Sequence, residues 1–278
     1  MTKSLVLRLG LFPFVLAILV FTLPTPAEAG PWTKSAGEYY VKIGESLYRA
    51  TSHRTGSGLL ISGTDYLSAT TYGYAEVGVW DDLHLQAYIP LMYARTTPGN
   101  ETFSDFGMGD ARFAVQHSPL DLAFPTSIRL ETKIPLYGEP ATPQTPARGG
   151  QQVDFSLWLS AGGGFSNIPL YLYLDAGYQH RTSWTFGDTV VPEYSDGIVT
   201  LAQVGYNVMD TFILAVGTSG VIALEQDQIS ESYITVGPSV FWPLTDLLAI
   251  EFDSYFTPYS RNSAEGWSVG MGLSFRRD

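Results

Sequence analysis

Few side chains in this sequence are spaced so that they could act together on a substrate. His180 and Ser183 would offer a base and a nucleophile, but no G-x-S-x-G or comparable context surrounds any serine. The histidines are far apart and show no i,i+4 metal spacing. They are His53, His84, His117 and His180. We therefore expect no catalytic residue, metal site or cofactor, and no enzyme, with a hydrolase that uses His180 and Ser183 as a third alternative.

A second set of ionisable and aromatic residues falls at alternate positions of short apolar segments. Arg129, Glu131 and Lys133 alternate with apolar residues in this way. If alternate residues share one face, adjacent segments form cross-strand ion pairs inside a polar interior. The candidate lining residues are Arg112, Arg129, Glu131, Lys133, Asp154, Asp175, Glu251, Asp253, Tyr88 and Tyr173. Two interpretations stay open, a selectivity filter that favours neutral or cationic solutes and structural filling of a narrow lumen.

Composition excludes several classes of protein. The 278 residues contain 15 Lys+Arg and 27 Asp+Glu, a net charge of -12, which argues against a nucleic-acid partner. Cysteine is absent, so disulfides, thiolate metal sites and a lipid-modified N-terminal cysteine are excluded. Only 15% of residues are charged and 14% are aromatic, which is unusual for a water-soluble enzyme.

The N-terminal segment has the features of a secretory signal peptide. Lys3 and Arg8 precede an apolar run over residues 9–23, and an A-x-A site follows at Ala27–Ala29. The run is short and contains Pro13, which favours cleavage over a membrane anchor. We predict a signal peptide at residues 1–29 and a mature domain at 30–278. Nothing later in the sequence is long and apolar enough for a spanning helix, so any spanning segments would be strands.

The mature sequence alternates apolar and polar residues in segments of about ten residues. The segments start near Glu38, Thr70, Leu83, Asp110, Ser127, Val153, Leu170, Ile198, Phe212, Tyr233, Leu247 and Gly266. Short turns alternate with longer polar segments, the latter at 51–68, 95–108, 138–151, 180–196, 225–231 and 258–264. This pattern predicts an all-β fold, a transmembrane antiparallel up-and-down β-barrel of about 12 strands with its short turns in the periplasm.

The apolar side of these segments would face lipid, because in hydrocarbon only a closed barrel satisfies every strand edge. Trp80, Tyr93, Trp242 and Trp267 fall near segment ends, where interfacial aromatic girdles occur. A soluble β-sandwich would also alternate, but it would show water a more strongly charged face. The registers of the first, eighth and ninth segments are ambiguous, and Gly44 beside Glu45 suggests a bulge.

Two stretches resemble known sequences. The alternation from Trp267 to Phe275 resembles the C-terminal signal read by the outer-membrane assembly machinery, although residues 276–278 follow it. The stretch Phe106–Phe113, together with strand ends at Ile89–Pro90 and Ile134–Pro135, resembles the G-x-G-D-x-x motif of outer-membrane proteins grouped with meta-pathway phenol degradation. This resemblance implies an outer-membrane barrel with a role in uptake of small aromatic or apolar compounds, and it transfers no catalytic residue.

The sequence thus favours a channel or transporter for a small solute in the outer membrane of a Gram-negative cell. The expected partners are outer-membrane lipid, the assembly machinery and an unidentified small molecule. The alternative is a structural or surface-interaction barrel, adhesin-like, whose lumen is sealed by ion pairs.

Overall fold

A computed structural model describes residues 31–120, 122–138, 144–165, 167–185, 192–208, 211–225 and 227–277. The segment predicted as a signal peptide, residues 1–29, lies outside them and stays a prediction. The strands are β1 (Tyr39–Arg54), β2 (Leu60–Trp80), β3 (Leu83–Pro98), β4 (Phe103–Met108), β5 (Asp110–His117), β6 (Thr126–Pro135), β7 (Gln152–Phe165), β8 (Ile168–Thr185), β9 (Gly197–Val208), β10 (Phe212–Ala223), β11 (Ser232–Pro243), β12 (Leu248–Arg261) and β13 (Ser263–Arg277).

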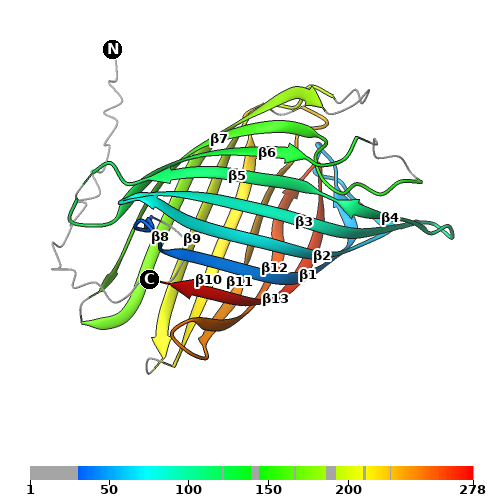
Figure 1. The fold of residues 1–278 in the computed structure, drawn as a ribbon. Helices are drawn as coiled ribbons and strands as arrows, with labels where there is room; N and C mark the ends of the chain where they lie inside the picture. Colours follow the sequence, from blue (N-terminus) through cyan, green and yellow to red (C-terminus); the bar gives the residue numbers. More distant parts are fainter. Residues whose placement is uncertain are drawn as a thin grey trace, which may run out of the picture.

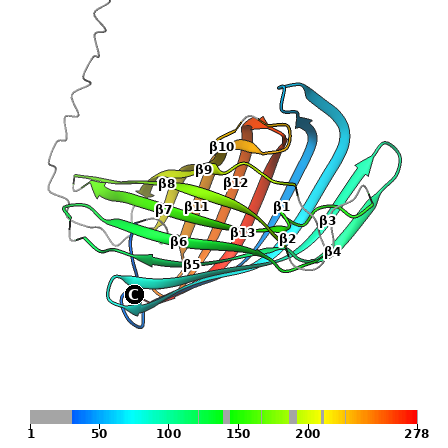
Figure 2. The same cartoon turned by 90° about the horizontal axis from the view of Figure 1, so that it is seen from above.

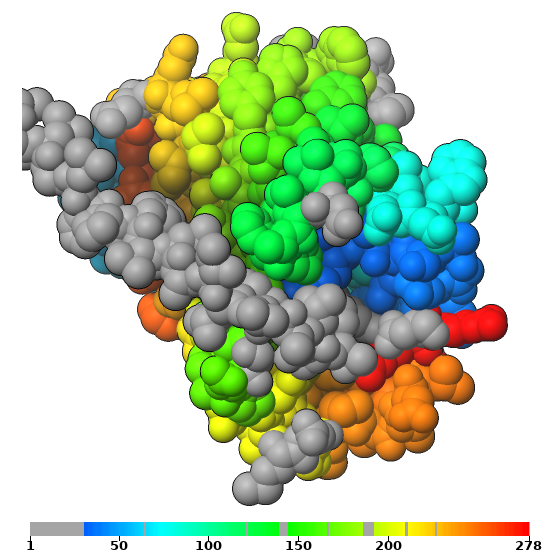
Figure 3. All heavy atoms as spheres, turned by 90° about the vertical axis from the view of Figure 1, so that its left-hand side faces the viewer, coloured from blue at the N-terminus to red at the C-terminus, as the bar shows by residue number. Residues whose placement is uncertain are grey.

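These strands form one closed antiparallel barrel, as the alternation predicts (Figure 1). The first and last strands pair from Tyr39↔Arg277 to Arg54↔Ser263, so the ladder has no free edge. In the end view of Figure 3 the red C-terminal residues lie beside the blue first strand. Strand β4, before Gly109, and strand β5, after it, pair with successive parts of β3 and together form one barrel strand. The barrel therefore has twelve strands. A Cβ at Gly109 would lie 2.6 Å from Met92 Sδ, so glycine permits the close approach there.

Alternation divides each strand into an outer apolar face and an inner polar or aromatic face. On β6 the outward Leu130 is 62% exposed, whereas the side chain of Arg129 is only 13% exposed. On β13 five successive outward residues are apolar and exposed, namely Trp267, Val269, Met271, Leu273 and Phe275. The apolar belt predicted for the lipid-facing side is therefore present.

Short and long connections lie at opposite ends of the barrel, as expected. The first and last described residues share one end with turns such as Asp81–Asp82, where Asp82 adopts a left-handed φ of 61°. At the other end the β3–β4 hairpin extends beyond its neighbours, as Figures 1 and 2 show. We call these the terminal end and the loop end.

The loop end differs from the prediction in three respects. Strand β2 begins at Leu60 and not near Thr70, and most of the polar segments 51–68, 95–108 and 258–264 is strand. Backbone pairing continues there without a continuous apolar outer face, because beyond the lipid that face meets water. The β1 bulge lies between Ala50 and Ser52 and not at Gly44. The fourth barrel strand starts at Phe103, earlier than the predicted Asp110.

A cluster of buried apolar residues lies inside the barrel. Trp158, Val199 and Val221 are buried together, and Tyr233 packs against them. The lumen is therefore partly filled at this level. Within the described ranges, the structure contains no helix long and apolar enough to cross a membrane.

Candidate functional site in the barrel lumen

Arg129 of β6 and Trp158 of β7 form the centre of the lumenal site. They are opposite each other in the β6–β7 ladder, and the guanidinium carbon lies 4.7 Å from the indole ring centroid. Arg129 Nη2 also lies 3.7 Å from Asp175 Oδ2 on β8. The Arg129 charge is thus shared between an aromatic face and a carboxylate. Arg129 Nε and Trp158 Nε1 are buried donors without a hydrogen-bond partner among the described residues.

Lys133 of β6 holds a second ion-pair group closer to the loop end. Its Nζ lies 2.8 Å from Asp154 Oδ2 and 3.3 Å from Asp110 Oδ2. Gln179 Nε2 donates to Asp154 Oδ2 at 3.2 Å, and the amide of Gly150 donates to Asp110 Oδ2 at 2.7 Å. This group therefore joins strands β5 to β8 and binds the loop after β6 to the inner wall.

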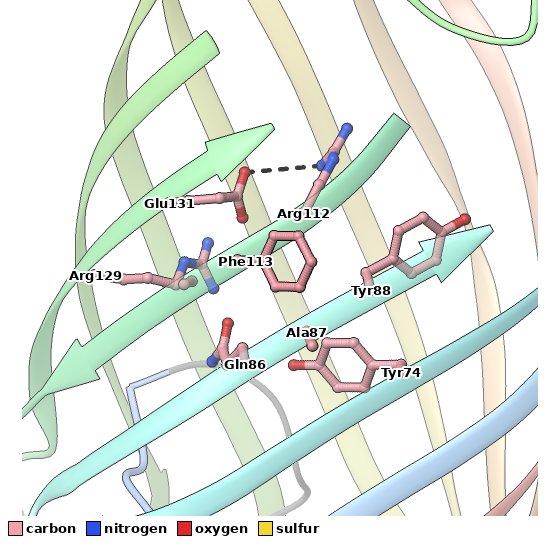
Figure 4. A pocket seen from close by; sticks show the side chains of 9 residues that line it. Tyr74, Gln86, Ala87, Tyr88, Arg112, Phe113, Arg129 and Glu131 are labelled. Carbon is pink, nitrogen blue, oxygen red and sulfur yellow. Dashed lines mark ion pairs between the residues drawn. The ribbon is translucent and has the colours of Figure 1, made fainter. Parts of the chain in front are cut away.

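Arg112 of β5 is the least constrained cation among the candidates. Its guanidinium lies 4.0 Å from Glu131, and its side chain is 54% exposed. Figure 4 shows this pair beside Tyr74 and Tyr88, at the edge of a cavity of about 350 Å³. A second cavity of about 670 Å³ also contacts Arg112, Arg129 and Glu131 and extends toward the loop end. The two cavities share these residues, so a solute could contact guanidinium, carboxylate and phenol groups together.

A third group lies on the opposite wall. Lys42 Nζ donates to Glu251 Oε2 at 2.7 Å, and the Tyr40 hydroxyl donates to Glu251 Oε1. Asp253 faces the lumen two residues further along β12 and forms no ion pair within the described part of the chain. The opposite wall thus carries a surplus of negative charge.

The segment that precedes β1, residues 31–38, lies inside the terminal end. The Trp32 ring makes edge contacts with Tyr171 and Tyr173, with centroids 6.3 and 6.2 Å apart. The Lys34 amide donates to His84 Nδ1 at 3.3 Å. A Cβ at Gly78 would lie 1.8 Å from Ser35 O, so the segment packs directly against the backbone of glycine there.

We call residues 31–38 the N-terminal strap. The strap occupies part of the lumen between β3 and β8.

Groups outside the strands also close over the loop end. Arg148 Nε lies 2.5 Å from Asp105 Oδ2, and its guanidinium carbon lies 4.9 Å from the centroid of the Tyr137 ring. The Tyr66 hydroxyl donates a hydrogen bond to Ala147 O at 3.0 Å. Burial, together with the Asp110 carboxylate, raises the pKa of Tyr137 above its usual range. Arg181 lies over the ring of Tyr194, 5.7 Å from its centroid.

The ten candidate residues all lie on the inner face, but they form separate groups. Arg112, Glu131 and Tyr88 border the smaller cavity, Arg129 contacts Asp175, and Lys133 contacts Asp154. Glu251 and Asp253 lie on the far wall, and Tyr173 contacts the strap. Their role in selectivity stays a prediction.

Sequence reasoning missed Trp32, Lys34, Arg148 and Arg181. Trp32, Lys34 and Arg148 lie in segments without strand alternation, so no periodic signal could place them inside the barrel. The one sequence feature that could have indicated a lumenal position is the isolated Trp32, just after the proposed cleavage site. In the described part of the chain, no group of three His, Asp or Glu side chains is arranged to hold a metal ion.

A closed twelve-stranded antiparallel barrel with an apolar outer belt defines the class of outer-membrane-type β-barrels. A solved outer membrane channel from Pseudomonas putida F1 matches with a TM-score of 0.71 and 10% identity, covering 91% of this chain and 100% of that chain. The translocator domain of the autotransporter NalP from Neisseria meningitidis matches with a TM-score of 0.54 and 9% identity, over 87% and 90% of the two chains. The NanC porin also gives 0.54, with 10% identity, over 84% and 98%.

At these identities the likeness concerns the fold. No family model matches the chain, and no curated protein matches it. The grouping with meta-pathway phenol degradation therefore stays a prediction.

Proposed function

We propose that this protein is an outer-membrane channel through which small neutral or cationic solutes, aromatic ones included, cross the envelope. The observation that carries the proposal is the combination of an apolar outer belt with a lumen that contains cavities of about 350 and 670 Å³. The barrel fold shared with a solved outer membrane channel supports the same conclusion.

The chemistry of the lumen supports the solute class. The smaller cavity is bordered by Tyr74 and Tyr88, and the larger one by Trp158 and Tyr233, which offer flat apolar surfaces for a ring. Most lumenal cations are already held by carboxylates, while Asp253 has no cationic partner within the described residues. The remaining negative charge disfavours anions.

A sealed structural or surface-interaction barrel is the second candidate. The N-terminal strap favours it because the strap fills part of the terminal end, and ion pairs join strands across the loop end. The long paired strands of the loop end would then be the functional surface.

Conductance measurements separate the two proposals. Purified protein in planar bilayers should give steady current steps if solutes pass, and vesicles that contain the protein should swell faster in a small aromatic alcohol than in an anionic sugar. Absence of both signals, from protein that shows heat-modifiable migration on a gel, would leave the surface-interaction proposal. Fractionation of cells tests the outer-membrane location independently.

A further inference from the structure

Two arginines lie on the outer face of the barrel. Arg49 of β1 and Arg95 of β3 are both opposite Leu67 of β2, so they share one row across three strands. Asp65, two residues from Leu67 on the same face, contacts both. Arg49 Nε and Nη2 lie 3.0 and 3.1 Å from the two Asp65 oxygens, and Arg95 Nη2 lies 3.9 Å from Oδ2. We call these three residues the outer arginine cluster.

The cluster lies at the boundary of the apolar belt. Arg49 is opposite Trp267 of β13, the residue at which the outward apolar run to Phe275 begins. Tyr93 lies next to Arg95 on the same face of β3. An apolar band in such barrels is about 25 Å tall and is flanked by aromatic residues. A run of nine residues tilted by about 40° covers a similar height. The arginines are thus at the level of lipid head groups on the loop-end side.

An apolar groove starts directly below the cluster, toward the terminal end. It has a volume of about 550 Å³, and Leu47 and Tyr93, each two residues from an arginine, line its upper part. The small side chain of Ala69 forms the floor between them. Leu91, Phe106, Val269 and Met271 complete the apolar walls. Glu45 lies in the groove one row further from the arginines. The groove has the volume and the apolar walls to hold part of an acyl chain.

Charge identifies the head group. Two guanidiniums share one carboxylate, which leaves a net positive charge in a chain with a net charge of -12. Arg95 Nε is buried and donates to no acceptor among the described residues. Planar guanidinium donors match phosphate oxygens, which accept several hydrogen bonds at once. A second copy of the chain is disfavoured because a two-fold contact through this patch would set arginine against arginine.

We propose that the outer arginine cluster and the groove below it bind lipid A, the phosphorylated glycolipid of the outer leaflet, with a phosphate on Arg49 and Arg95 and an acyl chain over Ala69. This proposal rests on the outer-membrane location proposed above. Lipid binding is measured on purified protein in detergent, so the result does not depend on where the protein lies in the cell. A negative binding result would therefore count against the lipid A site, whereas cell fractionation tests the outer-membrane location separately.

Native mass spectrometry of the purified barrel in non-ionic detergent, titrated with bis-phosphorylated lipid A, tests the proposal. The Arg49→Gln/Arg95→Gln variant should bind at least tenfold more weakly. Asp65→Asn removes the competing carboxylate and should bind more tightly. Ala69→Trp should weaken binding by filling the groove, and lipid A without its phosphates should bind weakly to the unaltered protein. Heat-modifiable migration checks that each variant is folded.

Arg277→Gln is the control for loss of an exposed arginine at the terminal end, and it should leave lipid A binding unchanged. Binding by the double arginine variant within twofold of the unaltered protein would overturn the proposal. Equal binding by phosphatidylglycerol would also overturn it, since it would reduce the cluster to a general anionic-lipid contact. A lipid-free dimer that disappears in the arginine variant would assign the surface to a second copy instead.

Discussion

The ammonium of Lys133 lies 2.8 Å from the carboxylate of Asp154, opposite it in the β6–β7 ladder on the inner wall of the barrel. Asp154 is almost fully buried, so loss of the cation would leave its charge uncompensated.

Lys133→Met should therefore destabilise the barrel by about 3 to 5 kcal/mol, the usual cost of breaking a buried ion pair. Urea unfolding in lipid vesicles, followed by tryptophan fluorescence, measures the effect. The variant Lys133→Met/Asp110→Asn/Asp154→Asn removes all three charges and should recover most of the loss. A triple variant as unstable as the single one would show that packing, not charge, is responsible.

If solutes pass through the lumen as proposed, Glu251→Gln with Asp253→Asn should lower the preference for cations, because it removes negative charge from one wall of the lumen. Reversal potentials across a salt gradient report this preference. Asp81→Asn/Asp246→Asn removes two exposed carboxylates from turns between strands, so it is the matched control and should leave the cation preference unchanged. Identical reversal potentials in the double variant would exclude these carboxylates as determinants of selectivity.

Trp32→Ala should raise the single-channel conductance, because the indole contacts Tyr171 and Tyr173 within the lumen and anchors the N-terminal strap. Trp184→Ala, at the loop end on the outer side, serves as the control for loss of a tryptophan. Conductance that stays at the original level would mean that the strap does not limit passage.

Asp227 makes the loop between β10 and β11 sensitive to acid. Partial burial opposes its ionisation, but hydrogen bonds from the Ser230 hydroxyl and amide and from the Ile229 amide outweigh that effect, and the pKa of Asp227 is lowered. Arg261 is the charged group that faces it. A lowered pKa gives stability that is present above the ordinary aspartate value of 3.8 and is lost as the pH falls through the value in the folded protein.

Hydrogen exchange in residues 227–232 should therefore be slow at pH 7 and, after correction for intrinsic rates, much faster near pH 2. Asp227→Asn should be faster at pH 7 and should lose most of this dependence. An unchanged pH response in that variant would assign the effect to another group.

Glu45 is a carboxyl group on the lipid-facing side, opposite Met271, which lies midway along the apolar run of β13. Acidic residues on this face destabilise a barrel, although less than basic ones. Glu45→Leu should raise the free energy of unfolding by about 1 to 2 kcal/mol. A loss of stability would indicate that the carboxyl group has a partner in the membrane.

The sequence predicted those parts of the fold that lipid constrains. From Leu83 to Leu91 every second residue must be apolar, and this requirement fixed the inner position of His84 and Gln86. Pairing of neighbouring strands then brought Lys133 opposite Asp154. Beyond the lipid the constraint ends, so the first ten residues of β2 gave no signal. The bulge near Thr51 and the strap around Trp32 depend on packing between distant segments, which no local pattern encodes.

Strand β2 has 21 residues, about 70 Å of extended chain, whereas about 9 to 11 residues suffice to cross a bilayer. The backbone of the described loop end is consequently paired in hydrogen-bonded ladders over much of its length. A protease binds several residues of its substrate in an extended conformation in its active-site groove. A strand that is paired on both sides would have to lose its ladder hydrogen bonds before it could bind there. If the loop end faces outward, intact cells treated with trypsin should therefore retain strands β1 to β3 uncut at Arg49, Arg54 and Arg95.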